Sequence, residues 1–457
     1  MKKGFKMPHA YVIIVIMLII VSAMTYVIPA GTYDRVKNAA GITMVNPASF
    51  KFVASNPIPP WRIPEFILEG LMAQRAVIFP MIVLTGGLAI LLATGAFHAF
   101  CYRMANISAG KEKMFIPVLL FVFSLIGITQ APYKFIGFAP LGVMLAATLG
   151  YDAIVGVAVV LLGIAIGFSC GIFGPTTAVA QQMAELPAYS GVSMRALAHL
   201  VLYAISAVYI TRYAERAKAD PTKSVLYGAT GVMEFNVESV KIPFNKRHAA
   251  VLGIFVMCFA VMMYGCIKYS WGLPMCGVCF LWAGILGGLA YGFGPSRIAE
   301  EFVKGIKGAI DPAFLIGLAG GCAVMLSKAR ILDTVVMYSA QTLNYFPNLF
   351  KAPVLMLINT VINFFVPSAT GQAAVVMPVM TPLADLSGLT RQTAVLAYKF
   401  GDGFSNYIYP HVSSLMGFIG AAGISYDKWM KFMGKLFAMW LFASLLIMML
   451  AYVIQYQ

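Results

Sequence analysis

The sequence predicts an all-α polytopic membrane protein, and two observations carry that prediction. Hydrophobic residues make up 60% of the chain and charged residues only 11%, and many apolar runs are long enough to cross a bilayer. Several runs are interrupted near their centres, most clearly at residues 401–413, GDGFSNYIYPHVS. Backbone N–H and C=O groups without a helical partner are tolerated at membrane depth only where protein or a water-filled cavity supplies their hydrogen bonds. The interruption therefore predicts a broken membrane helix around a polar site, with a loop between two short helices as the alternative.

Charge and cysteine content argue against other classes. The net charge of +15 comes without a basic soluble domain, so we expect no nucleic-acid partner, and loop cations facing the lipid bilayer instead. The seven cysteines lie mostly in apolar runs and lack zinc spacing, so we expect reduced core residues, no cofactor and no transition metal. The apolar run after residues 2–6 (KKGFK) continues to Ile28 and predicts a first spanning helix, not a signal peptide.

The first half, residues 1–213, contains one candidate hairpin and one candidate broken helix. Spans are expected at 10–28, 76–97 and 194–211, with an extracytoplasmic loop at 31–60 that contains a small hairpin and an interfacial helix at 64–75. Two short apolar arms at about 114–149 flank a polar tip, GITQAPYK at 127–134, and predict a re-entrant hairpin. The run at about 151–186 is interrupted by SCGIFGPTT at 169–177 and predicts a broken helix.

The second half, residues 269–457, has the same order of elements. It follows a cytoplasmic linker at 214–248 and a linking helix at 249–268. Spans are expected at 271–291, 309–327 and 436–453, with an amphipathic segment at 296–307. A hairpin is expected at about 353–386 with the tip PSATGQ at 367–372, and a broken helix at about 390–423. Together this gives nine full crossings and two hairpins.

Four local matches relate the halves in the same order. They are Glu65-Phe66 with Glu301-Phe302, Gly86-Gly87 with Gly320-Gly321, Thr129-Gln130-Ala131 with Thr370–Ala373, and Gly167-Phe168-Ser169 with Gly403-Phe404-Ser405. With a cytoplasmic N-terminus, the proposed inner segments carry nineteen Lys and Arg and the outer segments ten. The single linking helix at 249–268 adds one crossing, so the second half has the opposite orientation in the membrane. We therefore predict two inverted-topology repeats whose hairpins approach the midplane from opposite faces.

The tips and interruptions supply the candidate site residues. Half-helix N-termini suit anionic groups, whereas unwound carbonyls and half-helix C-termini suit small cations. The candidate substrate-binding residues are Thr129, Gln130, Lys134, Ser169, Thr176, Thr177, Ser368, Thr370, Gly371, Gln372, Asn406 and His411. The candidate residues for a coupling ion are Asp402, Gly403, Ser405 and Asn406, with Na⁺ at Asp402 and Asn406 as one form of the hypothesis. For the hydroxyl residues, helix-interface packing is the alternative.

Each ionisable candidate has a structural alternative. Asp402 serves a cation or proton, or forms a salt bridge with Lys399 or another buried group. Lys134 binds a substrate carboxylate or replaces a cation, or extends to the cytoplasmic interface. His411 relays a proton, or is a neutral hydrogen-bonded core histidine. His98 and His199 have no partner spacing and receive no role.

Two other function classes stay open at this point. Residues 167–171 read GFSCG and match the G-x-S-x-G motif, so an intramembrane serine hydrolase using Ser169 and a histidine such as His199 is one alternative. That motif normally lies on a strand–turn–helix at a sheet edge, whereas here it interrupts a membrane helix. An ion channel is the other alternative, although broken helices around one site favour alternating access.

Specific motifs resemble those of the YfcC-type members of the DcuC-like carriers, in the ion-transporter superfamily. They are YVIPAGTYDR at 26–35, GYD at 150–152, AELP at 184–187, GQAAVVMP at 371–378, TPLADL at 381–386, RQTAVLA at 391–397 and GDGFSN at 401–406. The resemblance covers nearly the whole chain. It implies secondary active transport of small organic acids or amino acids, driven by Na⁺ or H⁺ or by exchange. It also implies a multi-pass protein of the bacterial cytoplasmic (inner) membrane, not an enzyme, and a homodimer with an elevator mechanism.

The chain departs from the family pattern at three places. The first hairpin often carries an acidic pair, where this chain has Gln130 to Lys134; an Asn usually precedes the first-half Pro, where this chain has Gly174. The second interruption usually reads PTSG, where residues 410–413 read PHVS. A lysine in place of acids favours a substrate with negative charge over the basic amino acids attached to the family, which remain the alternative. We therefore expect a small carboxylate-bearing solute or amino acid between the tips and the interruptions.

Overall fold

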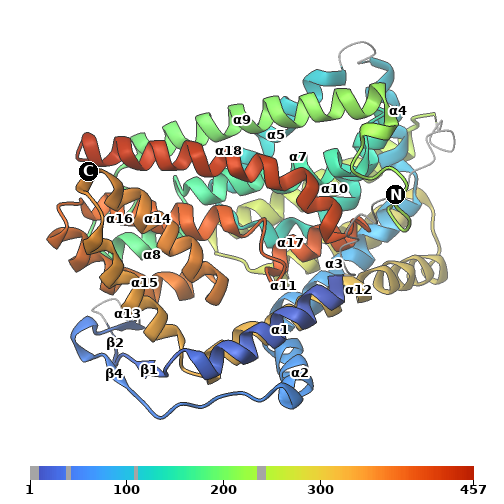
Figure 1. Cartoon of the computed structure of the whole chain (residues 1–457). Coiled ribbons are helices and arrows are strands. Elements are labelled where there is room, and N and C mark those ends of the chain that lie inside the picture. The colour runs from blue at the N-terminus through green and yellow to red at the C-terminus, as the bar shows by residue number, and fades with distance from the viewer. Residues whose placement is uncertain (1–9, 38–42, 108–111, 234–242) are drawn as a thin grey trace, which may run out of the picture.

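The structure, a computed structural model, describes residues 10–37, 43–107, 112–233 and 243–457 (Figure 1). It is mostly helical, and eight of the described helices are long and apolar enough to cross a membrane. These spans are Arg75–Ala93, Ala153–Met183 taken across its interruption, Val192–Ala219, Lys246–Lys268, Leu273–Tyr291, Pro295–Lys328, Asn348–Phe365 and Tyr426–Val453. The chain is therefore a multi-pass membrane protein, as its composition predicts.

The spans differ from the nine expected crossings at three places. The first helix, α1 (Ala10–Val27), is apolar but falls short of the spanning length over its described apolar part, Tyr11–Val27. The second broken run divides into α16 (Arg391–Ser405) and α17 (Ser413–Ala421), each too short to cross. In contrast, α14 (Asn348–Phe365), expected as a short hairpin arm, is long enough to span because it begins five residues before the predicted arm.

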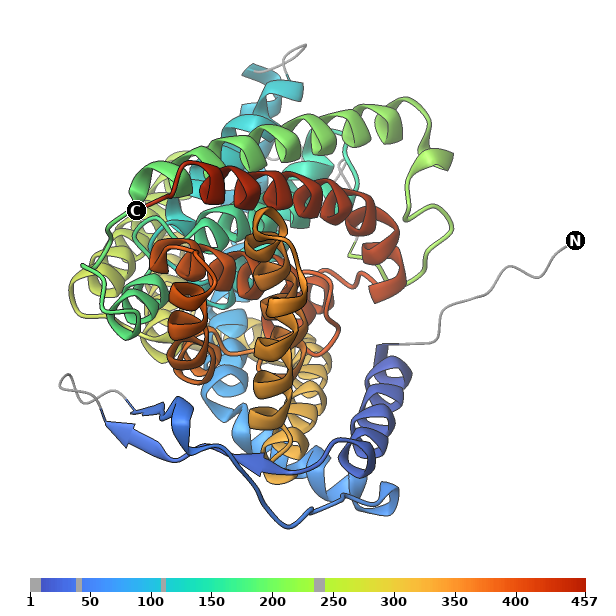
Figure 2. The same cartoon turned by 60° about the vertical axis from the view of Figure 1, so that its left-hand side comes forward.

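A short polar segment connects α1 to the next helix in the chain. Strand β1 (Gly31–Thr32) pairs antiparallel with β4 (Lys51–Phe52), and β2 (Arg35–Lys37) with β3 (Thr43–Val45). Arg35 anchors this segment by an ion pair to the buried Asp333, 2.9 Å between Nη1 and Oδ2. The small hairpin expected at 31–60 is therefore present. It lies at the lower edge of the molecule, beside α1 (Figure 2).

The rest of the first half consists of helices with short connections. After α2 (Ile63–Ala73) and α3 (Arg75–Ala93), α4 (Ala96–Ile107) follows a turn at Gly95. The predicted first hairpin comprises α5 (Phe115–Gly127), a 3₁₀ segment η4 (Pro132–Phe138) and α6 (Ala139–Thr148). The predicted first broken helix comprises α7 (Ala153–Cys170) and α8 (Pro175–Met183), and α9 (Val192–Ala219) completes this half.

The second half begins with α10 (Lys246–Lys268) and α11 (Leu273–Tyr291). The segment expected as an amphipathic helix and a separate span is one continuous helix, α12 (Pro295–Lys328), which tolerates Pro312 in its interior. After α13 (Leu332–Thr342), the predicted second hairpin comprises α14 and α15 (Ala369–Leu386). Helices α16 and α17 follow, and α18 (Tyr426–Val453) closes the chain.

The helices sort into two packing groups. Helices α2, α3, α10, α11 and α12 form an outer group, in which a Cβ on Gly284 of α11 would overlap the Gly87 carbonyl of α3. Helices α5 to α9 and α14 to α18 form a second, inner group, in which α7 is entirely buried. The two groups meet mainly where α12 packs against α17. The repeat relation between the halves, the domain bounds and the re-entry of the hairpins stay predictions.

Candidate functional site

A cavity of about 500 Å³, lined by polar and apolar side chains, lies where the two predicted hairpin tips meet the two helix breaks. Its walls come from α5–η4, α7–α8, α14–α15 and the connection between α16 and α17, with residues of α3 and the turn before it closing one side. The lining residues are Gln74, Val77, Thr129, Ala131, Pro132, Tyr133, Lys134, Phe168, Pro175, Thr176, Val179, Pro367, Ser368, Ala369, Thr370, Asn406, Tyr407, Val412, Ser413 and Ser414. Six of the predicted site residues are among them.

The first tip places a lysine in the cavity wall. After α5 ends, Pro132 begins the 3₁₀ segment η4 that carries Lys134. The Lys134 Nζ donates to Oε1 of Gln130, at 3.0 Å, and to the carbonyl of Trp271, at 2.9 Å. Thr129 lines the cavity, whereas Gln130 is 3% exposed and acts through Lys134. The lysine is therefore held at the cavity wall by two neutral acceptors, and its extension to a membrane interface stays an untested alternative.

The first break exists because of one glycine and one proline. Gly171 has a φ of 65° and ends α7 in the left-handed conformation, and Pro175 begins α8 at the position where its missing N–H costs nothing. Thr176 lines the cavity. Ser169 and Thr177 are fully buried instead, and their hydroxyl oxygens have no hydrogen-bond partner among the described residues.

The second tip is neutral. Ser368 caps α15 by accepting a hydrogen bond from the Gly371 N–H, at 3.4 Å, and both Ser368 and Thr370 line the cavity. Gln372 lies deeper, with its Nε2 donating to the carbonyl of Asn359 at 3.0 Å. Gly371 and Gln372 thus shape the start of α15 and are set back from the cavity wall.

The second break is ordered by an asparagine of the second hairpin. Nδ2 of Asn363 donates to Oδ1 of Asn406, at 2.8 Å, and to Oγ of Ser405, at 2.7 Å. Asn406 lines the cavity, and a Cβ on Gly403 would overlap the Ser169 side chain of the first break. His411 is 3% exposed and packs against Phe364, with ring centroids 5.0 Å apart. The interruption begins at Asn406 and not at the predicted Gly401, because α16 continues to Ser405, so Asp402, Gly403 and Ser405 are helical.

A buried ion pair lies behind the wall formed by the first break. Nζ of Lys399 is 3.7 Å from Oδ2 of Asp402, and both side chains are fully buried. The same ammonium donates to Oγ1 of Thr176, at 3.0 Å, and lies 4.2 Å from the centroid of the Phe168 ring. Because Thr176 and Phe168 also line the cavity, they connect the pair to it. The salt bridge considered for Asp402 is thus formed.

Two buried cations beside this site have no role predicted from the sequence. Lys399 is considered there only as a partner for Asp402, although a lysine two residues before the GDG motif is itself a costly membrane residue. Arg195 is fully buried, and its Nη1 donates to the carbonyl of Gly171, at 3.3 Å, at the end of α7. Its Nη2 also donates to Oε1 of Gln392, at 3.2 Å. Arg195 therefore ties the first break to the start of α16.

The serine-hydrolase alternative requires contact between Ser169 and a histidine. His199 is hydrogen-bonded to a different serine, with 3.1 Å between its Nε2 and Oγ of Ser124. The Ser169–His199 pair that was considered is therefore not formed.

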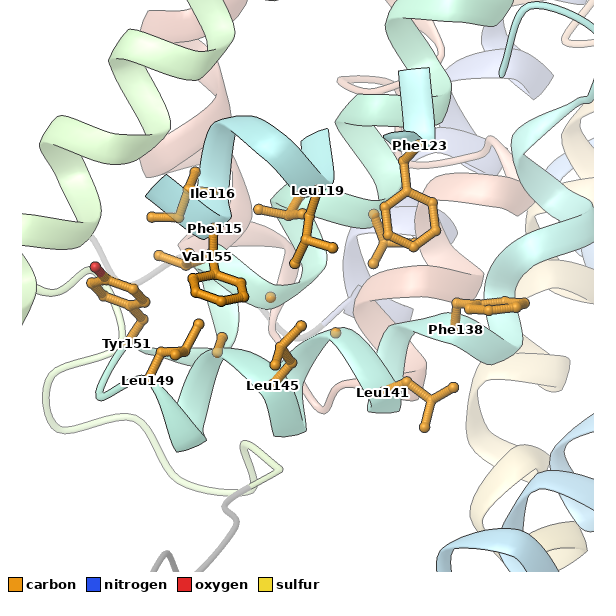
Figure 3. A pocket seen from close by; sticks show the side chains of 15 residues that line it. Phe115, Ile116, Leu119, Phe123, Phe138, Leu141, Leu145, Leu149, Tyr151 and Val155 are labelled. Atoms are coloured by element: carbon orange, nitrogen blue, oxygen red, sulfur yellow. The ribbon is translucent and has the colours of Figure 1, made fainter. Parts of the chain in front are cut away.

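A second cavity, of about 140 Å³, lies between α5, α6 and α7 (Figure 3). Phe115, Leu119, Phe123 and Leu145 face it, and Tyr151 contributes the one oxygen seen among the labelled side chains (Figure 3). An almost entirely apolar lining of this kind cannot replace the hydrogen bonds that a small polar solute loses on leaving water. The cavity at the tips and breaks is therefore the better candidate for a transport site.

Comparisons with known proteins identify the class of the chain. The sequence is 29% identical to the "Putative basic amino acid antiporter YfcC" of Escherichia coli (strain K12), over 96% of this chain and 95% of that protein. It is 26% identical to an uncharacterised protein of Haemophilus influenzae, with 94% of each chain covered. Among solved structures, the YdaH transporter of Alcanivorax borkumensis aligns with a TM-score of 0.45 at 16% identity, covering 97% of this chain and 98% of that one. The profile of the family described as "DcuC: C4-dicarboxylate anaerobic carrier" matches residues 7–453, and the chain therefore belongs to the DcuC family of membrane transporters.

Proposed function

We propose that the chain is a secondary active transporter for a small carboxylate-bearing organic solute or amino acid. The observation that carries this proposal is the 500 Å³ cavity, because it joins both tips and both breaks and is large enough for such a solute. Thr129, Thr176, Ser368 and Thr370 supply hydroxyls to it. These groups can replace the hydrogen bonds that the solute exchanges with water.

The charge of the cavity wall favours an anionic group on the substrate. Among the described residues that line it, Lys134 is the one with a formal charge, since the others are neutral. Its two present acceptors, the Gln130 amide and the Trp271 carbonyl, are uncharged, so the ammonium has no carboxylate partner of its own there. A substrate carboxylate would provide one, and a charge-assisted hydrogen bond is the stronger kind.

Ion coupling is proposed at the pair behind the wall. Neither oxygen of Asp402 has a hydrogen-bond partner among the described residues, and the hydroxyls of Ser169, Thr177 and Tyr407 are likewise buried and unpartnered. Buried polar oxygens of this kind fit a small cation or a proton. Asp402 would bind this cation or proton, and Ser169 and Asn406 from the two breaks lie nearby. The bound charge would change the ion pair with Lys399, and Lys399 contacts the cavity residue Thr176. Na⁺ and H⁺ both fit this donor set.

An elevator mechanism fits the division of the helices. The inner group carries both tips and both breaks, whereas the outer group meets it mainly through α12 and α17. We propose that the inner group moves against an outer group fixed by a homodimer contact, in a cytoplasmic membrane with the N-terminus inside. Cross-linking of cysteines introduced into α12 and α17 in the presence and absence of ligand would test the motion, and mass photometry would test the dimer.

A thermal-stability screen of the purified chain tests the substrate class. The compounds are dicarboxylates, neutral amino acids, sugar-acid conjugates, arginine and ornithine, each with Na⁺ or with choline. A ligand that binds only the native state raises the melting temperature by mass action. The proposal expects stabilisation by acids that Lys134→Gln removes. An effect of Na⁺ on that stabilisation would distinguish Na⁺ from H⁺ coupling.

Basic amino acid exchange is the second candidate, because the Escherichia coli relative carries that description. It requires the cavity to bind a cationic side chain, with the buried Asp402 behind the wall as an acid that could pair with it. Stabilisation by arginine or ornithine without Na⁺, unaffected by Lys134→Gln, would favour it and contradict the carboxylate proposal.

A further inference from the structure

A third cavity lies between α9 and α18, and its lining residues are different from those of the cavity at the tips and breaks. These helices run side by side along the upper edge of the molecule in both views (Figures 1 and 2). The Tyr209 hydroxyl of α9 donates to the Phe432 carbonyl of α18, at 2.7 Å, which fixes the register of the two helices. Beside this contact the surface opens into a cavity of about 750 Å³.

Five cations from three segments converge on this cavity. Arg212 and Arg216 come from the last turns of α9, Lys223 from the segment that follows, and Lys431 and Lys435 from α18. Loop cations are common at membrane surfaces, but they are not usually gathered around one hollow.

Acidic groups neutralise this cluster only in part. Nζ of Lys431 lies 3.8 Å from Oδ2 of Asp427, and Nζ of Lys223 lies 3.4 Å from Oδ2 of Asp220. Arg212, Arg216 and Lys435 make no ion pair within the described residues. The nearby acid Glu215 accepts the Tyr151 hydroxyl instead, at 2.6 Å. The cavity therefore has an excess of positive charge.

The other end of the cavity is apolar. Ala204, Ile205 and Val208 of α9 and Met439 of α18 line it, and Val208 is 50% and Met439 37% exposed. From Ala204 to Arg216 the cavity follows α9 for about 18 Å at 1.5 Å per residue. It therefore changes from apolar to strongly basic along the axis of a membrane helix, which is the polarity of a phospholipid.

We propose that the cavity between α9 and α18 binds an anionic phospholipid. The phosphate lies among Arg212, Arg216, Lys431 and Lys435, and an acyl chain lies along Ile205, Val208 and Met439. Arginine and lysine pockets between membrane helices suit such head groups. A free phosphate ion would use the basic end alone and leave the apolar end unexplained. The proposal does not depend on the transported substrate.

The test compares lipids and two matched pairs of lysines in the full-length chain. Native mass spectrometry of the detergent-purified protein measures bound dioleoyl phosphatidylglycerol against dioleoyl phosphatidylcholine. The cavity variant is Lys431→Gln with Lys435→Gln. The control is Lys304→Gln with Lys307→Gln on α12, which removes the same charge and likewise includes one lysine paired to an acid, Lys304 with Glu301 at 2.7 Å. A second variant, Arg212→Gln with Arg216→Gln, removes the two cations that α9 contributes to the cavity.

We expect phosphatidylglycerol to bind in preference to phosphatidylcholine. Each cavity variant should weaken phosphatidylglycerol binding by about ten- to thirty-fold, whereas the control should keep the wild-type affinity. Equal binding of the two lipids, or an equal loss in the control, would overturn the proposal, because the cations would then act only as general surface charge. Displacement of the lipid by millimolar inorganic phosphate would identify a free-anion site and would also overturn it.

Discussion

The two helix breaks differ in backbone and in charge, because the first ends α7 at a left-handed glycine, Gly171, whereas the second follows α16 at Asn406 in the right-handed helical conformation. The first, between α7 and α8, carries Ser169, Gly171 and Thr176 and no charge of its own. The second follows α16, which buries both Lys399 and Asp402. At the tips the order is reversed, because the first carries Lys134 and the second is neutral. The charged groups of the site thus lie at the first tip and on the helix that leads into the second break.

The largest expected effect comes from separating the pair in the second break. Lys399→Met leaves the Asp402 carboxylate buried without its cation, and we expect a loss of about 3–5 kcal/mol in the free energy of unfolding together with loss of transport. Denaturant unfolding in detergent and uptake into proteoliposomes measure the two effects. The double variant Lys399→Met with Asp402→Asn should recover most of the stability and none of the ion-driven accumulation. If the double variant still accumulates substrate against a gradient, coupling does not use this pair.

The contact between the two breaks should give the next largest effect. In Gly403→Ala the new methyl group overlaps Ser169, and we expect a loss of about 1–3 kcal/mol in stability, with impaired transport. Ser169→Gly in the same chain should restore part of it. Gly434→Ala on α18, where an added Cβ meets nothing within 4 Å, is the control and should be neutral or stabilising. An equal loss in both alanine variants would mean that the contact between the breaks is unimportant.

Replacing the charge at the first tip should act on substrate affinity more than on stability. Lys134→Gln keeps a polar group but removes the cation, and we expect the apparent affinity for an acidic substrate to fall about tenfold or more. The melting temperature without ligand should change little, because both acceptors of the lysine are neutral. Uptake kinetics at several substrate concentrations measure the effect. Unchanged kinetics for an acid would remove Lys134 from the binding site.

The smallest effect concerns the hydroxyl between the cavity and the buried pair. Thr176→Val removes the acceptor for the Lys399 ammonium, and we expect a loss of about 0.5–1.5 kcal/mol in stability with a change in ion dependence. Thr370→Val, which lines the cavity from the second tip, is the matched control and should alter substrate affinity alone. If the two variants behave alike, Thr176 acts as an ordinary wall residue.

The positions of the breaks could be predicted from the sequence, but their contents only in part. Gly171 and Pro175 interrupt a helix through local backbone effects, which a sequence shows directly, whereas the second interruption, predicted to begin at Gly401, begins after Ser405 because α16 continues through both glycines. The contacts of Lys399 with Thr176 and of Arg195 with Gly171 join residues far apart in the chain, 223 and 24 positions respectively. No local pattern determines which buried cation meets which partner. Likewise, Gly371 and Gln372 match the tip by position but do not line the cavity, and the Gln372 Nε2 donates to the Asn359 carbonyl of α14 instead.

Helix α12 was expected as two elements because its composition changes near Gly308, from charged to apolar. The backbone has no reason to stop there, so it continues for 34 residues. At 1.5 Å per residue the helix is about 51 Å long, against a hydrocarbon core of about 30 Å. Even at the steepest common tilt, about 40°, some eight residues must leave the hydrocarbon. The charged stretch from Arg297 to Lys307 is suited to that part, so the length of α12 carries the outer group beyond the hydrocarbon core.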